Sequence, residues 1–312
     1  MFRHLAILLL AAVLSAHAQD LAGDLTLHRL LIDGENWQLV ADGIGFADGA
    51  CADAAGNFYF SDLRGNAIYK VAPDGQPEKI FDEAASGLKF GPDGRLFACQ
   101  GAKKRIVALD LASKAIEVLA EGVTPNDLVV TQRGHLYATL TRTQQVLLFD
   151  LKTKTRRVVD HGITTPNGLT LSPDQGTLAV SDYRGENVWV FRIEPDGTLS
   201  AKAPCMTMRL PIDSKGQFRF HHPPPYLKES GGGGMTSDTI GRYYVTTTLG
   251  VQVFDPTGRF CGLLTNAHPG HAPTNCVLAG TGRAWLYVTQ HDKVFRRKVQ
   301  ATGNVFEAAP AP

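Results

Sequence analysis

The sequence predicts an all-β fold, a six-bladed β-propeller in which four-stranded sheets surround a central axis. An apolar strand that ends in a turn glycine and is followed by a second strand recurs six times. The turn glycines are Gly56, Gly94, Gly134, Gly176, Gly241 and Gly282. The steps between them are 38, 40, 42, 65 and 41 residues. A period near 40 residues with about four strands per unit is typical of propeller blades.

The unit around Gly134 gives the clearest view of one blade. We expect its four strands at residues 126–130, 135–140, 145–151 and 155–160. Their apolar alternation is imperfect, which is typical of strands that neighbouring blades cover on both faces. Residues 37–42 precede the first blade, and we expect this N-terminal strand to join the last blade and close the ring. Closure removes the exposed sheet edges that an open array would present.

The N-terminus resembles a Sec-type signal peptide. Arg3 precedes an apolar run at residues 5–15, and Ala16-His17-Ala18 is a small-x-small cleavage site. We therefore expect cleavage after Ala18 and a periplasmic or secreted protein. The expected boundaries are 1–18 for the signal peptide, 19–308 for a single propeller domain and 309–312 for a disordered tail.

Composition narrows the possible partners. The formal net charge is +1 and no later apolar run reaches membrane length, so we expect neither nucleic-acid binding nor membrane insertion. A small-molecule substrate remains the expected partner, and the oligomeric state is open. The five cysteines show no zinc motif, and their odd number leaves at least one outside any intramolecular disulfide. We expect most of them to be small buried apolar residues.

The step of 65 residues predicts an insertion at about residues 200–230. Its prolines and its pair His221 and His222 indicate a loop rather than an additional strand. Insertions of this length often act as lids over a functional site, although some are only surface loops.

One position in each blade predicts a shared site. It lies seven to nine residues before the turn glycine, where the innermost strand begins. Its occupants are Asp48, Ser86, Asn126, Asn167, Gly233 and Asn275. Corresponding positions of a propeller converge on the axis, and a hard cation such as calcium prefers carboxylate and amide oxygens. The alternative is that these Asp and Asn side chains only cap turns at strand starts.

The segments that contain these residues resemble the regucalcin/gluconolactonase/luciferin-regenerating enzyme family. They include DGACADAAGNFYFSD, PNDLVV, TTPNGLTLSPD, GGMTSDTIGRYYVTTTLGVQVFDPTGR and TNCVLAGTGRAWLYVT, and the resemblance extends over about residues 35–300. It implies a six-bladed propeller with one divalent cation near the axis, usually Ca²⁺, with Mn²⁺, Zn²⁺ and Mg²⁺ as alternatives. It also implies hydrolysis of a sugar lactone or a similar cyclic ester.

The resemblance implies a metal-ligand set with two departures. Asn126 and Asn167 match the two Asn ligands of the family, and Asp48 stands where the family has Glu. Gly233 stands where the family has an Asp that binds the metal and activates water. Loss of that charge predicts weaker calcium binding.

Two nearby acidic residues could replace the missing Asp. Asp238 matches Asp53 in an Asp-x-x-Gly turn and is therefore expected to cap that turn. Glu229 precedes a run of glycines, which is either a flexible linker after the insertion or a hinge that lets Glu229 reach the site.

These observations lead to two hypotheses of different class. The first is an exported metal-dependent lactone hydrolase. Its candidate catalytic residues are Asp48, His271 and Glu229, and its candidate substrate-binding residues are Ser86, Asn275, His161 and His222. The second is a non-catalytic carbohydrate- or small-molecule-binding propeller that lost the metal-ligand Asp at Gly233. Different chemistry on the same fold, with a transition metal and a His base, is a third possibility.

Overall fold

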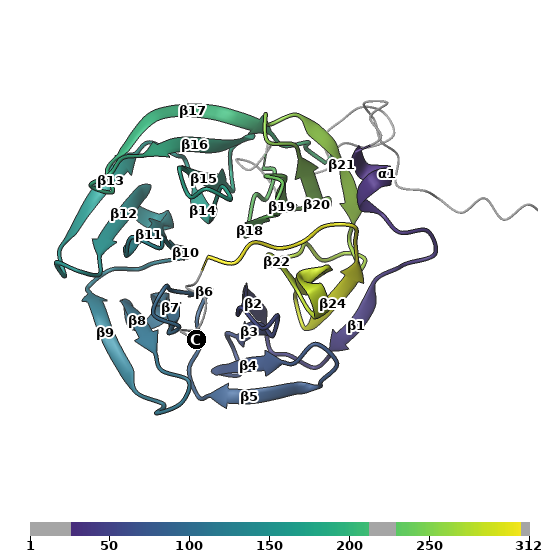
Figure 1. Cartoon of the computed structure of the whole chain (residues 1–312), viewed down its shortest axis with the longest axis horizontal. Helices are drawn as coiled ribbons and strands as arrows, with labels where there is room; N and C mark the ends of the chain where they lie inside the picture. Colours follow the sequence, from purple (N-terminus) through teal and green to yellow (C-terminus); the bar gives the residue numbers. More distant parts are fainter. Residues whose placement is uncertain (1–25, 212–228, 307–312) are drawn as a thin grey trace, which may run out of the picture.

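The computed structural model describes residues 26–211 and 229–306. Six four-stranded antiparallel sheets form a ring around a central axis (Figure 1). The predicted all-β, six-bladed propeller is therefore confirmed. The predicted signal peptide and tail, and most of the predicted insertion, lie outside the described residues. Within those residues, no helix reaches the length and apolarity that crossing a membrane requires.

The first three blades follow the chain in order, each with its first strand nearest the axis and its fourth on the outside (Figure 1). The first contains β2 (Ala47–Ala52), β3 (Phe58–Asp62), β4 (Ala67–Val71) and β5 (Pro77–Phe81). The second contains β6 (Gly87–Phe90), β7 (Leu96–Gln100), η1 (Gly101–Lys103), β8 (Arg105–Leu109) and β9 (Ile116–Glu121). The third contains β10 (Leu128–Val130), β11 (His135–Leu140), η2 (Thr141–Thr143), β12 (Gln145–Asp150) and β13 (Arg156–His161). The predicted strands of the third blade thus match within two residues.

The last three blades repeat this arrangement. The fourth contains β14 (Pro166–Leu171), β15 (Thr177–Asp182), β16 (Asn187–Ile193) and β17 (Leu199–Thr207). The fifth contains β18 (Met235–Ser237), β19 (Tyr243–Thr247), β20 (Gly250–Phe254) and β21 (Phe260–Thr265). The sixth contains β22 (Asn275–Ala279), η3 (Thr281–Arg283), β23 (Trp285–Gln290) and β24 (Lys293–Lys298), and its outer strand is the N-terminal β1 (Gln38–Ala41).

The ring closes as the sequence predicts. β1 pairs antiparallel with β24, with Gln38 opposite Arg296 and Leu39 opposite Phe295. The short helix α1 (Thr26–Leu30) packs beside β21, and its Leu27 and Leu30 are fully buried there. Helix α1 therefore covers part of the seam between the fifth and sixth blades.

Strands β3, β7, β11 and β19 are buried along their whole length. Neighbouring blades cover both faces of such strands, which explains why their sequences are nearly continuous apolar runs. Four of the five cysteines, Cys51, Cys99, Cys261 and Cys276, are buried, as predicted.

The predicted start of the insertion is wrong by several residues. Residues 199–207 form β17, the outer strand of the fourth blade, which pairs with β16 from Asn187 to Ile193. Most of its residues, such as Lys202, are exposed, so the segment lacks the apolar pattern that identifies inner strands. The rest of the predicted insertion is described only at residues 208–211 and 229–230.

Candidate functional site

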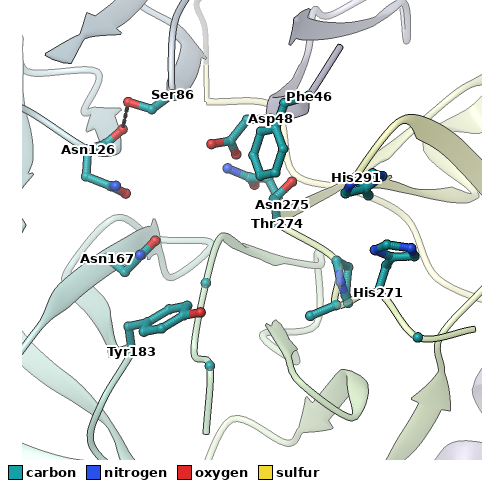
Figure 2. Close-up of a pocket in the computed structure, with 15 residues that line it drawn as sticks. Phe46, Asp48, Ser86, Asn126, Asn167, Tyr183, His271, Thr274, Asn275 and His291 are labelled. Carbon is teal, nitrogen blue, oxygen red and sulfur yellow. Dashed lines mark hydrogen bonds between the residues drawn. The ribbon is translucent and has the colours of Figure 1, made fainter. Parts of the chain in front are cut away.

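All six residues at the predicted convergent position line one cavity at the axis, with a volume of about 370 Å³. They are Asp48, Ser86, Asn126, Asn167, Gly233 and Asn275, and each lies within two residues of the start of the inner strand of its own blade. Figure 2 shows the side chains of five of them, all but Gly233, around a common space. The sequence periodicity therefore identified a real meeting point, and the roles of these residues remain predictions.

The main chain holds Asn126 and Asn167 in place while their amides face the cavity (Figure 2). The Ser86 hydroxyl donates to the Asn126 carbonyl oxygen at 2.5 Å, and the Thr139 hydroxyl donates to the Asn167 carbonyl oxygen at 2.5 Å. These bonds join neighbouring blades. In the described part of the chain, neither side-chain amide makes a hydrogen bond, so both remain available to a ligand.

Asp48 is the acidic side chain of the cavity lining. Its Oδ1 accepts a hydrogen bond from the Gly49 amide at 2.9 Å. Burial, with a smaller contribution from the nearby charge of Asp127, raises the pKa of Asp48 to about 8. A cation bound beside this carboxylate would favour its ionised form.

Asp127 is an axial carboxylate that the sequence reasoning missed. It is 5 % exposed, and burial raises its pKa to about 6. A β-carbon on Gly87 would lie 2.5 Å from its Oδ1, so the glycine at the start of β6 makes room for it. The available signal is its position directly after Asn126, at the start of the strand predicted over residues 126–130.

The donor set fits a hard divalent cation. Asp48 supplies a carboxylate, and Asn126 and Asn167 supply amide oxygens with no competing partner within the described residues. Calcium and magnesium favour such oxygen ligands, although a single carboxylate implies modest affinity. Three or more His, Cys, Asp or Glu side chains arranged to share an ion do not occur in residues 26–211 or 229–306, so a soft-metal site finds no support there.

The glycines at 231–234 are packed tightly against the neighbouring blades. All four are buried. The Gly233 amide donates to the Thr246 carbonyl oxygen at 2.9 Å, and the Ser181 hydroxyl donates to the Gly233 carbonyl oxygen at 2.8 Å. The flexible-linker interpretation is therefore wrong, because these bonds fix the segment that leads into β18.

Glu229 does not reach the cavity. Its carboxylate pairs with Arg184 at 3.2 Å and is absent from the lining residues. Asp238, as predicted, caps its turn: it accepts the amide of Arg242 at 2.9 Å and the hydroxyl of Tyr244 at 2.9 Å. The described chain thus places neither residue where the family Asp would stand.

The predicted histidines separate into three groups. His271 lines the cavity. His161 ends the outer strand β13, is exposed and does not line the cavity, so its predicted substrate contact finds no support. The Asp182 carboxylate accepts hydrogen bonds from the amides of Thr164 and Thr165, which fixes the loop between β13 and β14. His161 precedes this loop and lies outside the cavity lining. His222 lies outside the described residues.

Three imidazoles stack beside the cavity, and two of them were not predicted. The ring of His271 lies 4.1 Å from that of His291 and 4.6 Å from that of His268, measured between centroids. His291 also lines the cavity, and its Nδ1 lies 3.2 Å from Asp292 Oδ1. Partial burial and the neighbouring His291 and His268 lower the pKa of His271.

Residues 46–292 match the model of the SMP-30/gluconolactonase/LRE-like region. The chain belongs to this family. The match begins beside Asp48 and ends beside His291, so it includes the whole cavity lining. The resemblance that the sequence motifs indicated is confirmed.

Individual relatives are distant. The chain is 26 % identical to a gluconolactonase from Zymomonas mobilis over 304 residues, which covers 85 % of this chain and 82 % of the relative. A gluconolactonase structure from Xanthomonas campestris superimposes with a TM-score of 0.72 at 20 % identity, covering 88 % of this chain and 92 % of that one. A calcium-binding regucalcin from Agrobacterium tumefaciens gives a TM-score of 0.69 at 14 % identity, covering 89 % and 98 %.

Proposed function

We propose that this family member is an exported hydrolase that opens a sugar lactone or a similar cyclic ester with the help of a divalent cation, most simply Ca²⁺. The observation that carries the proposal is the axial cavity. It combines one carboxylate with two amides that have no other partner in the described chain. The distant homology to gluconolactonases points to the same substrate class.

Asp48, Asn126 and Asn167 would hold the cation, and a divalent ion there supplies polarisation of the ester carbonyl. The protein residues orient the substrate. Asn275 Oδ1 accepts the amide of Cys276 at 2.9 Å, and this bond fixes a side chain that lines the cavity. Ser86 and Tyr183 add hydroxyl groups to the wall.

The charge of the cavity favours a neutral substrate. Its lining contains no Lys or Arg among the described residues, so a substrate carboxylate would find no protein cation there. Phe46 and Tyr183 contribute aromatic surface, which suits the apolar face of a sugar ring. A neutral polyhydroxylated lactone combines these properties.

The test measures metal content and turnover of the mature protein. We expect a stoichiometric divalent ion, or a melting temperature that rises to saturation with one ion after EDTA treatment. We also expect EDTA-sensitive opening of D-glucono-1,5-lactone above the uncatalysed rate. Alanine at Asn126 or Asn167 should abolish the metal-dependent part, and full activity in both variants would refute the assignment.

Export is a separate part of the proposal and rests on the N-terminal sequence. N-terminal sequencing of the protein from a periplasmic or culture-medium fraction should give Gln19 as the first residue. A cytoplasmic protein that retains Met1 would contradict export without affecting the lactonase proposal.

A second candidate is a non-catalytic propeller that binds a carbohydrate or small molecule. The observation in its favour is Gly233, which removes a carboxylate that the family resemblance leads one to expect in the cavity. Sugar binding by calorimetry, with no metal uptake and no turnover, would favour this candidate.

A further inference from the structure

His291 stands in a structurally defined turn at the cavity. The turn joins β23 to β24, and His291 has a φ of 57°. Gln144 has a φ of 58° in the corresponding turn of the third blade. The Ala47 amide donates to the His291 carbonyl oxygen at 2.7 Å, and the Ile44 amide donates to the Asp292 carbonyl oxygen at 3.0 Å. Residues 44–47 therefore fix the backbone that presents His291.

The Asp292 carboxylate determines how the His291 ring can act. Asp292 Oδ1 lies 3.2 Å from Nδ1, which places the proton of a neutral imidazole on Nδ1. Nε2 is then the nitrogen with a free lone pair. A histidine that acts as a general base usually has a carboxylate beside one ring nitrogen and faces the substrate cavity with its ring.

His271 completes the arrangement from a loop that a buried glutamine anchors. The Gln290 amide donates to the carbonyl oxygens of His268, at 2.9 Å, and of His271, and its Oε1 accepts the His268 amide at 3.0 Å. The His271 ring consequently stacks on His291 at 4.1 Å. This network orders an imidazole pair before any ligand arrives.

We infer that His291, oriented by Asp292 and packed against His271, transfers the proton in the reaction of this cavity. The inference rests on the proposed lactone hydrolysis and supplies the acid–base group that Gly233 cannot. Figure 2 shows His271 and His291 on one side of the cavity and Asn126 and Asn167 on the other, so a bound lactone would lie between them.

The step requires no further reactant. The oxygen of a water molecule forms a bond to the lactone carbonyl carbon while one of its protons passes to His291 Nε2. The ring C–O bond then breaks, and the proton on Nε2 passes to the departing oxygen. The product is the open-chain hydroxy acid, and His291 returns to its neutral form.

The charged and titratable groups around His291 belong to four segments. They are Asp292 and Lys293 in its own turn, His268 and His271 in the anchored loop, Asp48 in β2, and Arg64, which lies over the Phe46 ring that contacts His291. Asp292 is the anion placed to stabilise a positive charge on His291.

The experiment measures the rate at which His291→Gln, His28→Gln and the wild-type holoprotein open D-glucono-1,5-lactone. The assay is run below pH 7, and the uncatalysed rate is subtracted. Gln144 has nearly the same positive φ, so glutamine tolerates the φ of position 291. His28 is exposed on α1, away from the cavity lining, and serves as the matched control. We expect kcat to fall about 100-fold or more in His291→Gln, with little change in KM.

Asp292→Asn tests the positioning role. It should lower kcat about tenfold or more with little change in KM, because the imidazole loses the carboxylate that holds its Nδ1 proton. Nuclear magnetic resonance of the ring nitrogens should show a smaller share of the Nδ1-protonated form of His291, without turnover. A purely structural role would lower the melting temperature but leave that share unchanged.

The outcomes separate this inference from the proposed function. An active wild type with His291→Gln within threefold of it overturns the base assignment and leaves lactone hydrolysis intact. A wild type inactive on lactones with every divalent ion overturns the proposed function and, with it, this role for His291. A large loss of kcat in His291→Gln but not in His28→Gln, with the melting temperature unchanged, supports both lactone hydrolysis and the role of His291.

Discussion

The carbonyl oxygen of Thr274 lies 2.8 Å from the point where a β-carbon on Gly233 would stand, and the Thr246 hydroxyl lies 2.7 Å from it. Real β-carbons do not approach backbone oxygens so closely, so a side chain at this position requires the inner strands of the fifth and sixth blades to move apart. The departure of this chain from the family Asp is therefore part of its packing as well as of its chemistry.

We predict that Gly233→Asp destabilises the protein and does not tighten metal binding. Overpacking of this kind costs about 1–3 kcal/mol of unfolding free energy, which urea denaturation measures. Gly176→Ala is the control, because the nearest atom to its β-carbon would lie at 3.4 Å, an ordinary contact. A Gly233→Asp variant with wild-type stability and higher calcium affinity would contradict the steric argument.

The side-chain amides of Asn126 and Asn167 should contribute to cation binding and contribute little to the stability of the fold. Neither the Asn126 nor the Asn167 side chain bonds to another described residue, so alanine at either position should change the metal-free unfolding free energy by less than about 1 kcal/mol. The rise in melting temperature on adding the cation should disappear. Scanning calorimetry with and without the cation measures both quantities.

Asn57→Ala provides the matched control for these variants. The Asn57 amide donates to Asp53 Oδ2 at 2.7 Å in a turn of the first blade, and neither residue lines the cavity. This variant should lower stability yet keep the cation-dependent rise in melting temperature. If Asn126→Ala and Asn167→Ala behave like Asn57→Ala, the amides are structural and the metal assignment is wrong.

The sequence predicted the ring and the meeting point because both depend on a repeat. Each blade reuses the same turn glycine, so one counted position in six blades marks the axis, and Asn126 and Asn167 were found in this way. Residues outside that position carried no periodic signal. Asp127 follows Asn126 at one strand start, and His291 reaches the cavity wall from one turn.

The histidines show the limit of reasoning from sequence distance. His161 and His271 both precede an axial Asn by a few residues. The outer strand β13 includes His161, whereas the loop with His271 folds over the cavity because Gln290 holds it. The hydrogen bonds from Gln290 that hold the His271 loop over the cavity join residues about 20 apart in the chain. A local sequence pattern cannot indicate such bonds.

The raised pKa of Asp48 should make the unfolding free energy of the metal-free protein depend on pH in an unusual direction. Its folded pKa of about 8 lies above the ordinary value of 3.8. Between about pH 4 and pH 8 the folded protein therefore holds a proton that the unfolded chain has released, so this group makes the unfolding free energy fall as pH rises. Asp48→Asn in EDTA should reduce that fall between pH 5 and pH 8 by at least about 1 kcal/mol.

The cation should reverse the trend for the wild type. Because it binds the ionised carboxylate, its stabilising effect should increase from pH 6 to pH 8 and its binding should release protons. Calorimetric titration in two buffers of different ionisation enthalpy measures the released protons. A cation effect independent of pH would mean that Asp48 is not a ligand.

Gln290 offers the last test, because it joins the stability of the sixth blade to the arrangement of its histidines. Its side chain is fully buried and satisfies three backbone groups of the loop that contains His268 and His271. Gln290→Ala leaves those groups without partners, so we predict a loss of about 1–3 kcal/mol in unfolding free energy. The freed loop should also lose the stacking of His271 on His291.

Gln100→Ala is the matched control. Gln100 is a buried glutamine of the second blade that donates to Glu83 and to the Ala84 carbonyl oxygen, and it does not line the cavity. Lactone turnover should fall further in Gln290→Ala than in this control. Equal turnover in the two variants, at equal loss of stability, would show that the anchored loop has no part in the reaction.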